Sequence, residues 1–211
     1  MAGTIWLPGL GGSSTNVRSM SIAEQKFAQV IRQQFDFSCG SAALATLLTF
    51  HYEDPIDELE AFDVMYANGD QARIAEAGFS LLDMKRFLES RGYQADGYSA
   101  SLDRLIDAGI PAIALINYRG YSHFVVVKGV RDGRVLVGDP ALGARLVPIP
   151  EFEEMWENGV LFIIRNKADV ATRYFNSDAE WQAMARAPIG RPLSEQGLAE
   201  FTVNLPRLGE F

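Results

Sequence analysis

Cys39 is the single cysteine of this chain, and it lies where a thiol could act as a nucleophile. It stands directly before an apolar run of helical character, and the partial positive charge of a helix N-terminus favours thiolate over thiol. Gly40 beside it would allow the backbone of a substrate to approach closely. Covalent chemistry at such a thiol also needs a base, a group that orients the base and an oxyanion donor. A lone cysteine is usually just a small buried apolar residue. Whether Cys39 is a nucleophile therefore depends on whether the chain supplies these partners.

The chain has two histidines that could serve as the base. His51 lies on the same expected helix as Cys39, and their spacing in the sequence separates them by roughly 18 Å at the helical rise per residue. His123 begins a run rich in valine, where a polar ring is costly without a partner or a task. We therefore predict that His123 is the base and that His51 has a structural or surface role.

Asp139 is the predicted orienting acid for His123, because two β-type runs should bring them together. Asp139 ends the second run, His123 begins the first, and a tight turn around Asp132 and Gly133 joins them. In such a hairpin the start of one strand meets the end of the next, and Asp132 lies at the wrong end. The alternative is that Asp139 only starts a turn with Pro140, as Asp-Pro pairs often do.

The oxyanion donors are less well determined by the residue pattern. The backbone N–H of Cys39, at the start of a helix, is one expected donor. Gln33 and Gln34 each carry a side-chain amide that could be the second, and the pattern alone does not choose between them. Four aromatic side chains could line a substrate groove or simply pack in the core: Tyr118, Tyr121, Phe152 and Trp156.

Composition excludes several classes of partner. The 211 residues are 48% hydrophobic and carry a net charge of −8, with a pI near 4.8. Nucleic acids and anionic lipids are bound through clustered lysine and arginine, so neither is expected as a partner. No apolar run reaches the roughly 18 residues of a membrane span, and the first residues lack the basic and apolar regions of a signal peptide. We expect no metal and no cofactor.

The order of the expected elements predicts an α+β fold, with N-terminal helices packed on a C-terminal antiparallel sheet. Helical patterns come first, at residues 39–52, 56–67, 81–91 and 102–108. Strand patterns follow at residues 112–117, 122–130, 134–139, 145–149 and 160–165, with a short helix at 152–156. The sequence further predicts an N-terminal arm over residues 1–20, a domain over 21–165 and an irregular extension over 166–211 with three prolines.

Three sequence blocks resemble the C39 peptidases, which are papain-like cysteine peptidases. The blocks occur in family order within roughly residues 30–165: Gln33-x-x-Asp36-x-Ser38-Cys39-Gly40-x-Ala42-Ala43-Leu44, then His123-Phe124-Val125-Val126, then Val137-Gly138-Asp139-Pro140-Ala141-x-Gly143. The segment Gly78–Met84 is also similar to stand-alone members. The resemblance implies a papain-like fold with Cys39 as nucleophile, His123 as base and Asp139 as orienting acid. It implies Gln33 as oxyanion donor, with Gln34 as the second choice.

The resemblance also implies a function, a cysteine peptidase that hydrolyses a peptide bond of an exported protein. Many members are fused to an export ATPase with membrane helices, and this sequence contains neither, so it resembles the free-standing branch. Within that branch, the sequence is similar to periplasmic proteins of functional-amyloid secretion systems in pseudomonads. This resemblance implies a periplasmic location. It also implies that the substrates or partners are exported amyloid or other secretion-system proteins. The alternative to a periplasmic location is the cytoplasm.

Two alternative functions are a non-catalytic module that binds an export substrate and a papain-like amidase or transglutaminase. The sequence does not indicate the oligomeric state.

Overall fold

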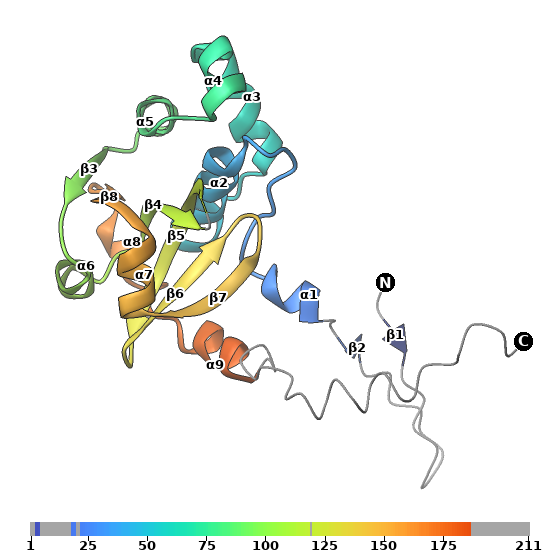
Figure 1. The fold of residues 1–211 in the computed structure, drawn as a ribbon, viewed down its shortest axis with the longest axis vertical. Helices are drawn as coiled ribbons and strands as arrows, with labels where there is room; N and C mark the ends of the chain where they lie inside the picture. Colours follow the sequence, from blue (N-terminus) through green and yellow to red (C-terminus); the bar gives the residue numbers. More distant parts are fainter. Residues whose placement is uncertain (1–2, 5–17, 20–21, 119, 187–211) are drawn as a thin grey trace, which may run out of the picture.

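The structure is a computed structural model that describes residues 3–4, 18–19, 22–118 and 120–186 (Figure 1). Two short strands, β1 (Gly3–Thr4) and β2 (Arg18–Ser19), pair antiparallel, and helix α1 (Ile22–Lys26) follows them. Most of the predicted arm over residues 1–20 lies outside the described residues, as does the predicted extension from residue 187 onward.

A six-stranded sheet in the order β3-β8-β4-β5-β6-β7 forms the centre of the domain, and every neighbouring pair of strands is antiparallel. The strands are β3 (Ala95–Ser99), β4 (Ala112–Tyr118), β5 (Tyr121–Arg131), β6 (Arg134–Asp139), β7 (Gly143–Pro148) and β8 (Trp156–Ile164). Their valine- and isoleucine-rich sequences suit a buried pleated surface. The predicted α+β class and antiparallel sheet are confirmed. Strand β3, which contains Gly97 and few β-branched residues, was not predicted.

Helix α2 (Cys39–His51) packs across β5 and forms the centre of the helical layer. Ala42, Ala43, Leu44 and Leu47 are fully excluded from solvent. The small alanines let neighbouring elements approach the helix closely, while the leucines fill the core. Because nearly the whole helix surface is covered, its first residue is held in a fixed place against the sheet.

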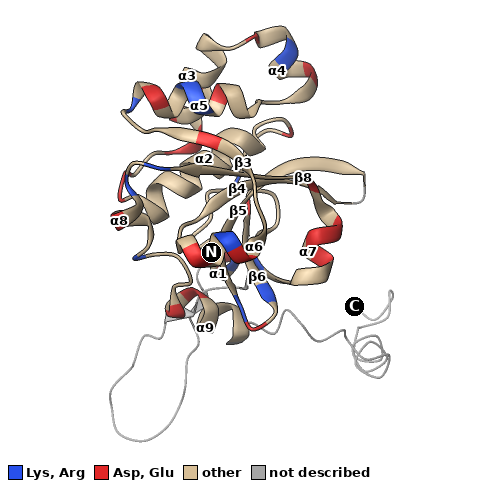
Figure 2. Cartoon of the chain, turned by 90° about the vertical axis from the view of Figure 1, so that its left-hand side faces the viewer, with Lys and Arg blue, Asp and Glu red and all other residues tan. Residues whose placement is uncertain are grey.

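Three further helices lie together at one end of the molecule, opposite α9 (Figures 1 and 2): α3 (Glu58–Asn68), α4 (Gln71–Ala77) and α5 (Leu81–Ser90). A capping box begins α5, with Ser80 and Asp83 each accepting a hydrogen bond from the other's backbone N–H. Helix α4 was not predicted. Ile74 is its single buried residue, so the sequence has no repeating apolar pattern at helical spacing there.

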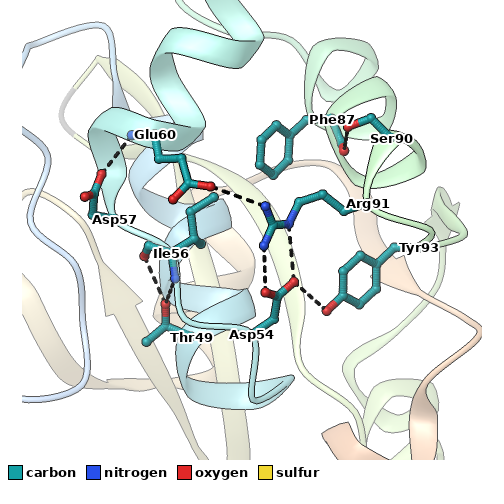
Figure 3. A network of polar contacts seen from close by, with 9 residues as sticks. All are labelled: Thr49, Asp54, Ile56, Asp57, Glu60, Phe87, Ser90, Arg91 and Tyr93. Carbon is teal, nitrogen blue, oxygen red and sulfur yellow. Dashed lines mark hydrogen bonds and ion pairs between the residues drawn. The ribbon is translucent and has the colours of Figure 1, made fainter.

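A polar network fixes the loop after α2 to the end of α5 (Figure 3). Asp54 accepts hydrogen bonds from Nη2 of Arg91 at 2.7 Å and from the Tyr93 hydroxyl at 2.9 Å. Arg91 also pairs with Glu60 of α3 at 3.4 Å. The loop is thereby joined to two helices at once, so α2, α3 and α5 are held as one unit.

The remaining helices of the domain cover the sheet and its ends. Helix α6 (Leu102–Ala108) ends at Gly109, which adopts a left-handed conformation with a φ of 62°. Helix α7 (Ile149–Met155) packs against β4, β6 and β7 and presents exposed glutamates to solvent (Figure 2). No helix in the described part of the chain is both long and apolar enough to cross a bilayer.

Residues 166–186, which were expected to be irregular, contain two helices, α8 (Ala168–Ala171) and α9 (Asp178–Arg186). Glu180 of α9 lies 2.6 Å from the ammonium group of Lys128, whose side chain is fully buried in β5. Trp181 is also buried, beneath the guanidinium group of Arg131. These contacts join positions about 50 residues apart, which is why local sequence patterns did not indicate them.

Candidate active site

Cys39 and His123 line the same cleft, which has a volume of about 510 Å³. Its walls come from the loop before α2, the segment that ends α4, and the β4–β5 hairpin. The lining residues are Asp36, Phe37, Cys39, Ala75, Glu76, Ala77, Gly78, Phe79, Leu115, Tyr121, Ser122, His123 and Phe124. The fold therefore brings the predicted nucleophile and the predicted base to one site, although 84 positions separate them in the chain.

A tight turn delivers Cys39 to the start of α2. The Ser38 hydroxyl donates to the Phe35 carbonyl at 2.9 Å and accepts from the Phe35 N–H at 3.1 Å. Ser38 thus uses its hydroxyl within the turn and makes no side-chain capping bond to α2. The N–H groups at the start of this helix are left without the usual serine cap, beside the sulfur of Cys39.

Glycines allow the helix and the opposite wall to come close. A Cβ added at Gly40 would lie 3.0 Å from Cβ of Phe79, so a larger residue would have to push Phe79 away. Gly78 adopts a φ of 75°, and a Cβ there would lie 3.2 Å from the Phe37 carbonyl oxygen. The two glycines therefore let α2 and the loop before it pack closely against the segment that follows α4.

Burial raises the pKa of the Cys39 thiol, whose residue is 8% exposed. Backbone hydrogen bonds from Phe124, Gly40 and Cys39 itself act in the opposite direction without overcoming burial. The thiol is therefore protonated at neutral pH, and a nucleophilic attack needs a base at the moment of reaction. One of these backbone groups belongs to Phe124, the residue that follows His123 on β5.

His123 and Asp139 form a buried pair, with 3.1 Å between Nε2 of the imidazole and Oδ2 of the carboxylate. Their residues are 3% and 0% exposed. The β5–β6 hairpin brings them together. Its register pairs Val126 with Gly138, and both of these residues lie between the His123–Asp139 pair and the turn. Within the described part of the chain, Nδ1 of His123 has no hydrogen-bond partner. This second nitrogen is available for proton transfer.

Asp139 contacts His123 through one carboxylate oxygen and begins a turn through the other. Its Oδ1 accepts from the backbone N–H groups of Ala141 at 2.9 Å and Leu142 at 3.1 Å. Burial alone would raise the pKa of Asp139, but His123, the Ala141 N–H and the charge of Arg145 outweigh it and lower this pKa. The carboxylate is ionised at neutral pH.

Arg145 is a site residue that the sequence analysis missed. Its Nη2 lies 3.4 Å from Oδ2 of Asp139, and its guanidinium group packs over the ring of Tyr118. Arg145 pairs with Val137 in the β6–β7 register, two positions before Asp139. That register, rather than any motif, is the signal that could have indicated it.

The structure places the two glutamines differently. Gln33 is half-buried and its backbone N–H donates to the Pro140 carbonyl at 3.1 Å, next to Asp139. Its side-chain amide donates to the Phe35 carbonyl at 3.0 Å, and Gln33 is not among the residues that line the cleft. Gln34 is exposed. The position of Gln33 links the Cys39 loop to the turn after Asp139.

The other residues considered from sequence have separate places. His51 is fully buried at the far end of α2, where burial and the nearby Lys128 hold its pKa well below the usual range. Phe152 is buried in the core against Trp156, at a ring distance of 5.8 Å. Of the four aromatic residues that could line a groove, Tyr121 is the one that lines this cleft.

Comparison with known sequences gives a consistent family match. Residues 28–168 match the family model described as the peptidase C39 family. The chain is similar to a protein of Pseudomonas aeruginosa named "probable functional amyloid protease FapD", with 43% identity over 202 residues, which covers 95% of this chain and 89% of the relative. The region matched by the family model contains every predicted site residue.

Solved structures share the fold. The peptidase domain of Streptococcus ComA, a bifunctional ABC transporter involved in quorum sensing, gives a TM-score of 0.55 at 18% identity, covering 64% of this chain and 96% of that domain. A double glycine motif protease from an AMS/PCAT transporter, solved in complex with the leader peptide, gives a TM-score of 0.52 at 25% identity, covering 64% of this chain and 89% of that one. The first likeness concerns the fold alone.

Proposed function

This chain belongs to the peptidase C39 family and is a cysteine peptidase, and on that premise we propose that Cys39, His123 and Asp139 form its catalytic triad. The observation that carries the proposal is the state of the His123 ring. Its Nε2 is bound to Asp139, its Nδ1 is free of partners among the described residues, and it lines the cleft that holds Cys39. Such an arrangement suits a general base whose tautomer is fixed by a carboxylate.

In the proposed reaction, Nδ1 of His123 takes the proton from Sγ of Cys39 as the sulfur attacks the substrate carbonyl carbon. The raised pKa of the thiol makes this transfer necessary at neutral pH. The buried carboxylate of Asp139 stabilises the imidazolium that forms. The imidazolium then gives its proton to the leaving amine, the C–N bond breaks, and a thioester remains on Cys39.

Water completes the cycle. His123 takes a proton from a water molecule, which attacks the thioester carbonyl, and the thiol leaves with the proton returned by His123. The oxyanion that forms in each half of the reaction needs fixed N–H donors. The uncapped start of α2, at Cys39 and Gly40, supplies backbone candidates. Gln33 is the proposed side-chain donor, and its amide would have to leave the Phe35 carbonyl to serve there.

The proposed substrate is an exported protein, with a component of an amyloid secretion system as the first choice. This rests on the name of the Pseudomonas relative, a probable functional amyloid protease, and on the peptide-cleaving family to which the chain belongs. The periplasm is the proposed location on the same ground.

The test uses a peptide library made by digesting a proteome, so that no substrate need be assumed. Incubation with the wild-type chain should give new peptide termini that share a sequence preference, identified by mass spectrometry. Cys39→Ala should give none, while its melting temperature stays close to that of the wild type. Library cleavage that persists in Cys39→Ala would overturn the proposal. Full rescue by Cys39→Ser of a strain that lacks this protein would also overturn it and would favour a non-catalytic binding module.

A further inference from the structure

Tyr121 connects the two halves of the proposed site. It is the first residue of β5 and stands two positions before His123, so both side chains project from the same face of the strand. The two rings are stacked, with centroids 5.5 Å apart and planes inclined by 27°. The phenol ring therefore covers one face of the proposed base and limits how the imidazole can rotate.

The hydroxyl of Tyr121 reaches the loop that carries the nucleophile. It donates to the backbone carbonyl of Asp36 at 2.5 Å, three positions before Cys39. The bonds between Ser38 and Phe35 are internal to its turn, and the Gln33 N–H joins the loop to the turn after Asp139. The bond from Tyr121 instead ties the turn to the strand that carries His123, across 85 positions of sequence.

The electrostatic surroundings of Tyr121 agree with this position. Burial raises the pKa of its hydroxyl, and the nearby Cys39 and Asp36 raise it further, while a hydrogen bond from the Gln33 side chain acts in the opposite direction. The hydroxyl therefore keeps its proton at neutral pH and remains a donor to the loop. One phenol thus interacts with the loop of the nucleophile, the ring of the base and the proposed oxyanion donor.

We propose that Tyr121 is a positioning residue, which sets the Cys39 loop and the His123 ring relative to each other. The inference rests on the proposed Cys39–His123 pair. Its ring fixes the plane of the imidazole, and its hydroxyl fixes the loop before α2. Reacting groups displaced by about 1 Å can lose on the order of 100-fold in rate, so a single hydrogen bond across the cleft has a measurable effect.

Two substitutions separate the roles of hydroxyl and ring. Tyr121→Phe keeps the stacked ring and removes the bond to Asp36; we expect kcat to fall about 10-fold with little change in KM. Tyr121→Leu removes both contacts, and kcat should fall further. The rate of Cys39 alkylation by iodoacetamide should fall in the same order, and this second readout needs no substrate. The kinetic assays use a peptide that the wild-type chain cleaves in the library experiment.

Tyr98→Phe is the matched control, because Tyr98 is also a partly exposed tyrosine but lies on β3 in a different groove. It should leave kcat, KM and alkylation unchanged. Since Tyr121 is 48% exposed, Tyr121→Phe should fold with a melting temperature close to that of the wild type. If Tyr121→Phe changes KM alone, or changes neither kcat nor the alkylation rate, Tyr121 only lines the cleft and the inference is wrong. Full activity in His123→Ala would instead overturn the proposed function itself.

Discussion

His123 Nε2 lies 3.1 Å from Asp139 Oδ2, in a contact almost wholly shielded from solvent. The two residues lie on neighbouring strands joined by a tight turn, so the register of the hairpin fixes their separation. A hydrogen bond on one imidazole nitrogen determines the tautomer and leaves the other nitrogen to exchange protons. In the proposed mechanism, Nε2 of His123 therefore holds the tautomer and Nδ1 exchanges the proton.

Asp139→Asn should reduce peptide cleavage by about 100-fold to 10,000-fold, because the imidazole loses its orienting charge and tautomer. Steady-state kinetics on a cleaved peptide measures the loss, which should lie in kcat. Asp132→Asn is the matched control at the opposite end of the same hairpin, where the side chain is 81% exposed. Equal activity of the two variants would contradict the role given to Asp139.

Arg145→Met should shift the acid limb of the activity profile to higher pH. The charge of Arg145 helps to lower the pKa of Asp139, so its removal raises that pKa, and the carboxylate becomes protonated at a higher pH than before. Activity at neutral pH should change little. A pH–rate profile measures the shift, with the exposed Arg134→Met as control. An unchanged acid limb would show that Arg145 does not act on Asp139.

Gly78→Ala should destabilise the fold by about 1–3 kcal/mol and reduce activity, because φ is 75° and the new Cβ would press on the Phe37 carbonyl in the cleft wall. Gly92→Ala is the control: its φ is 80°, but nothing lies within 4 Å of an added Cβ. It should lose stability from backbone strain alone and keep its activity. Urea unfolding and peptide kinetics compare the two, and equal losses of activity would be inconsistent with a wall formed at Gly78.

Glu180→Leu should lower the free energy of unfolding by about 3–5 kcal/mol, because it leaves the fully buried Lys128 without its counter-charge. The double variant Lys128→Met, Glu180→Leu should recover most of this loss, since an apolar pair can replace a buried ion pair. Urea unfolding of the wild type and both variants measures the effect. A negligible loss in Glu180→Leu would mean that α9 is not part of the cooperative fold.

The sequence predicted the elements whose signals are local. The apolar run after Cys39 and the turn at Gly133 each act within a few residues, and both are present. The family inferred from the three sequence blocks is also confirmed. Strand β3 and helix α9 were missed because contacts from distant residues stabilise them. Gly97 of β3 packs against Val160, and Trp181 of α9 packs beneath Arg131.

In the candidate site, the contact between His123 and Asp139 could also be predicted from local signals. The hairpin argument placed His123 beside Asp139, and the structure has them in contact. Arg145 and Tyr121 could not be assigned, because their roles depend on where a long side chain reaches. The hydroxyl of Tyr121 bonds to Asp36, far back in the chain, and no spacing rule indicates such a contact. The proximity of Tyr121 to His123 on one strand face was the available signal.

The most direct test of the proposed pair is the rate at which iodoacetamide alkylates Cys39 at pH 7, followed by intact mass. Because Cys39 is the single cysteine, every adduct reports this site. Burial raises the pKa of the thiol, so the reaction depends on a base that removes the proton, and the rate should rise as the pH is raised. We predict that His123→Ala, still folded by its melting curve, is alkylated at least about 10-fold more slowly than the wild type. Equal rates in the two proteins would contradict the pairing of Cys39 with His123.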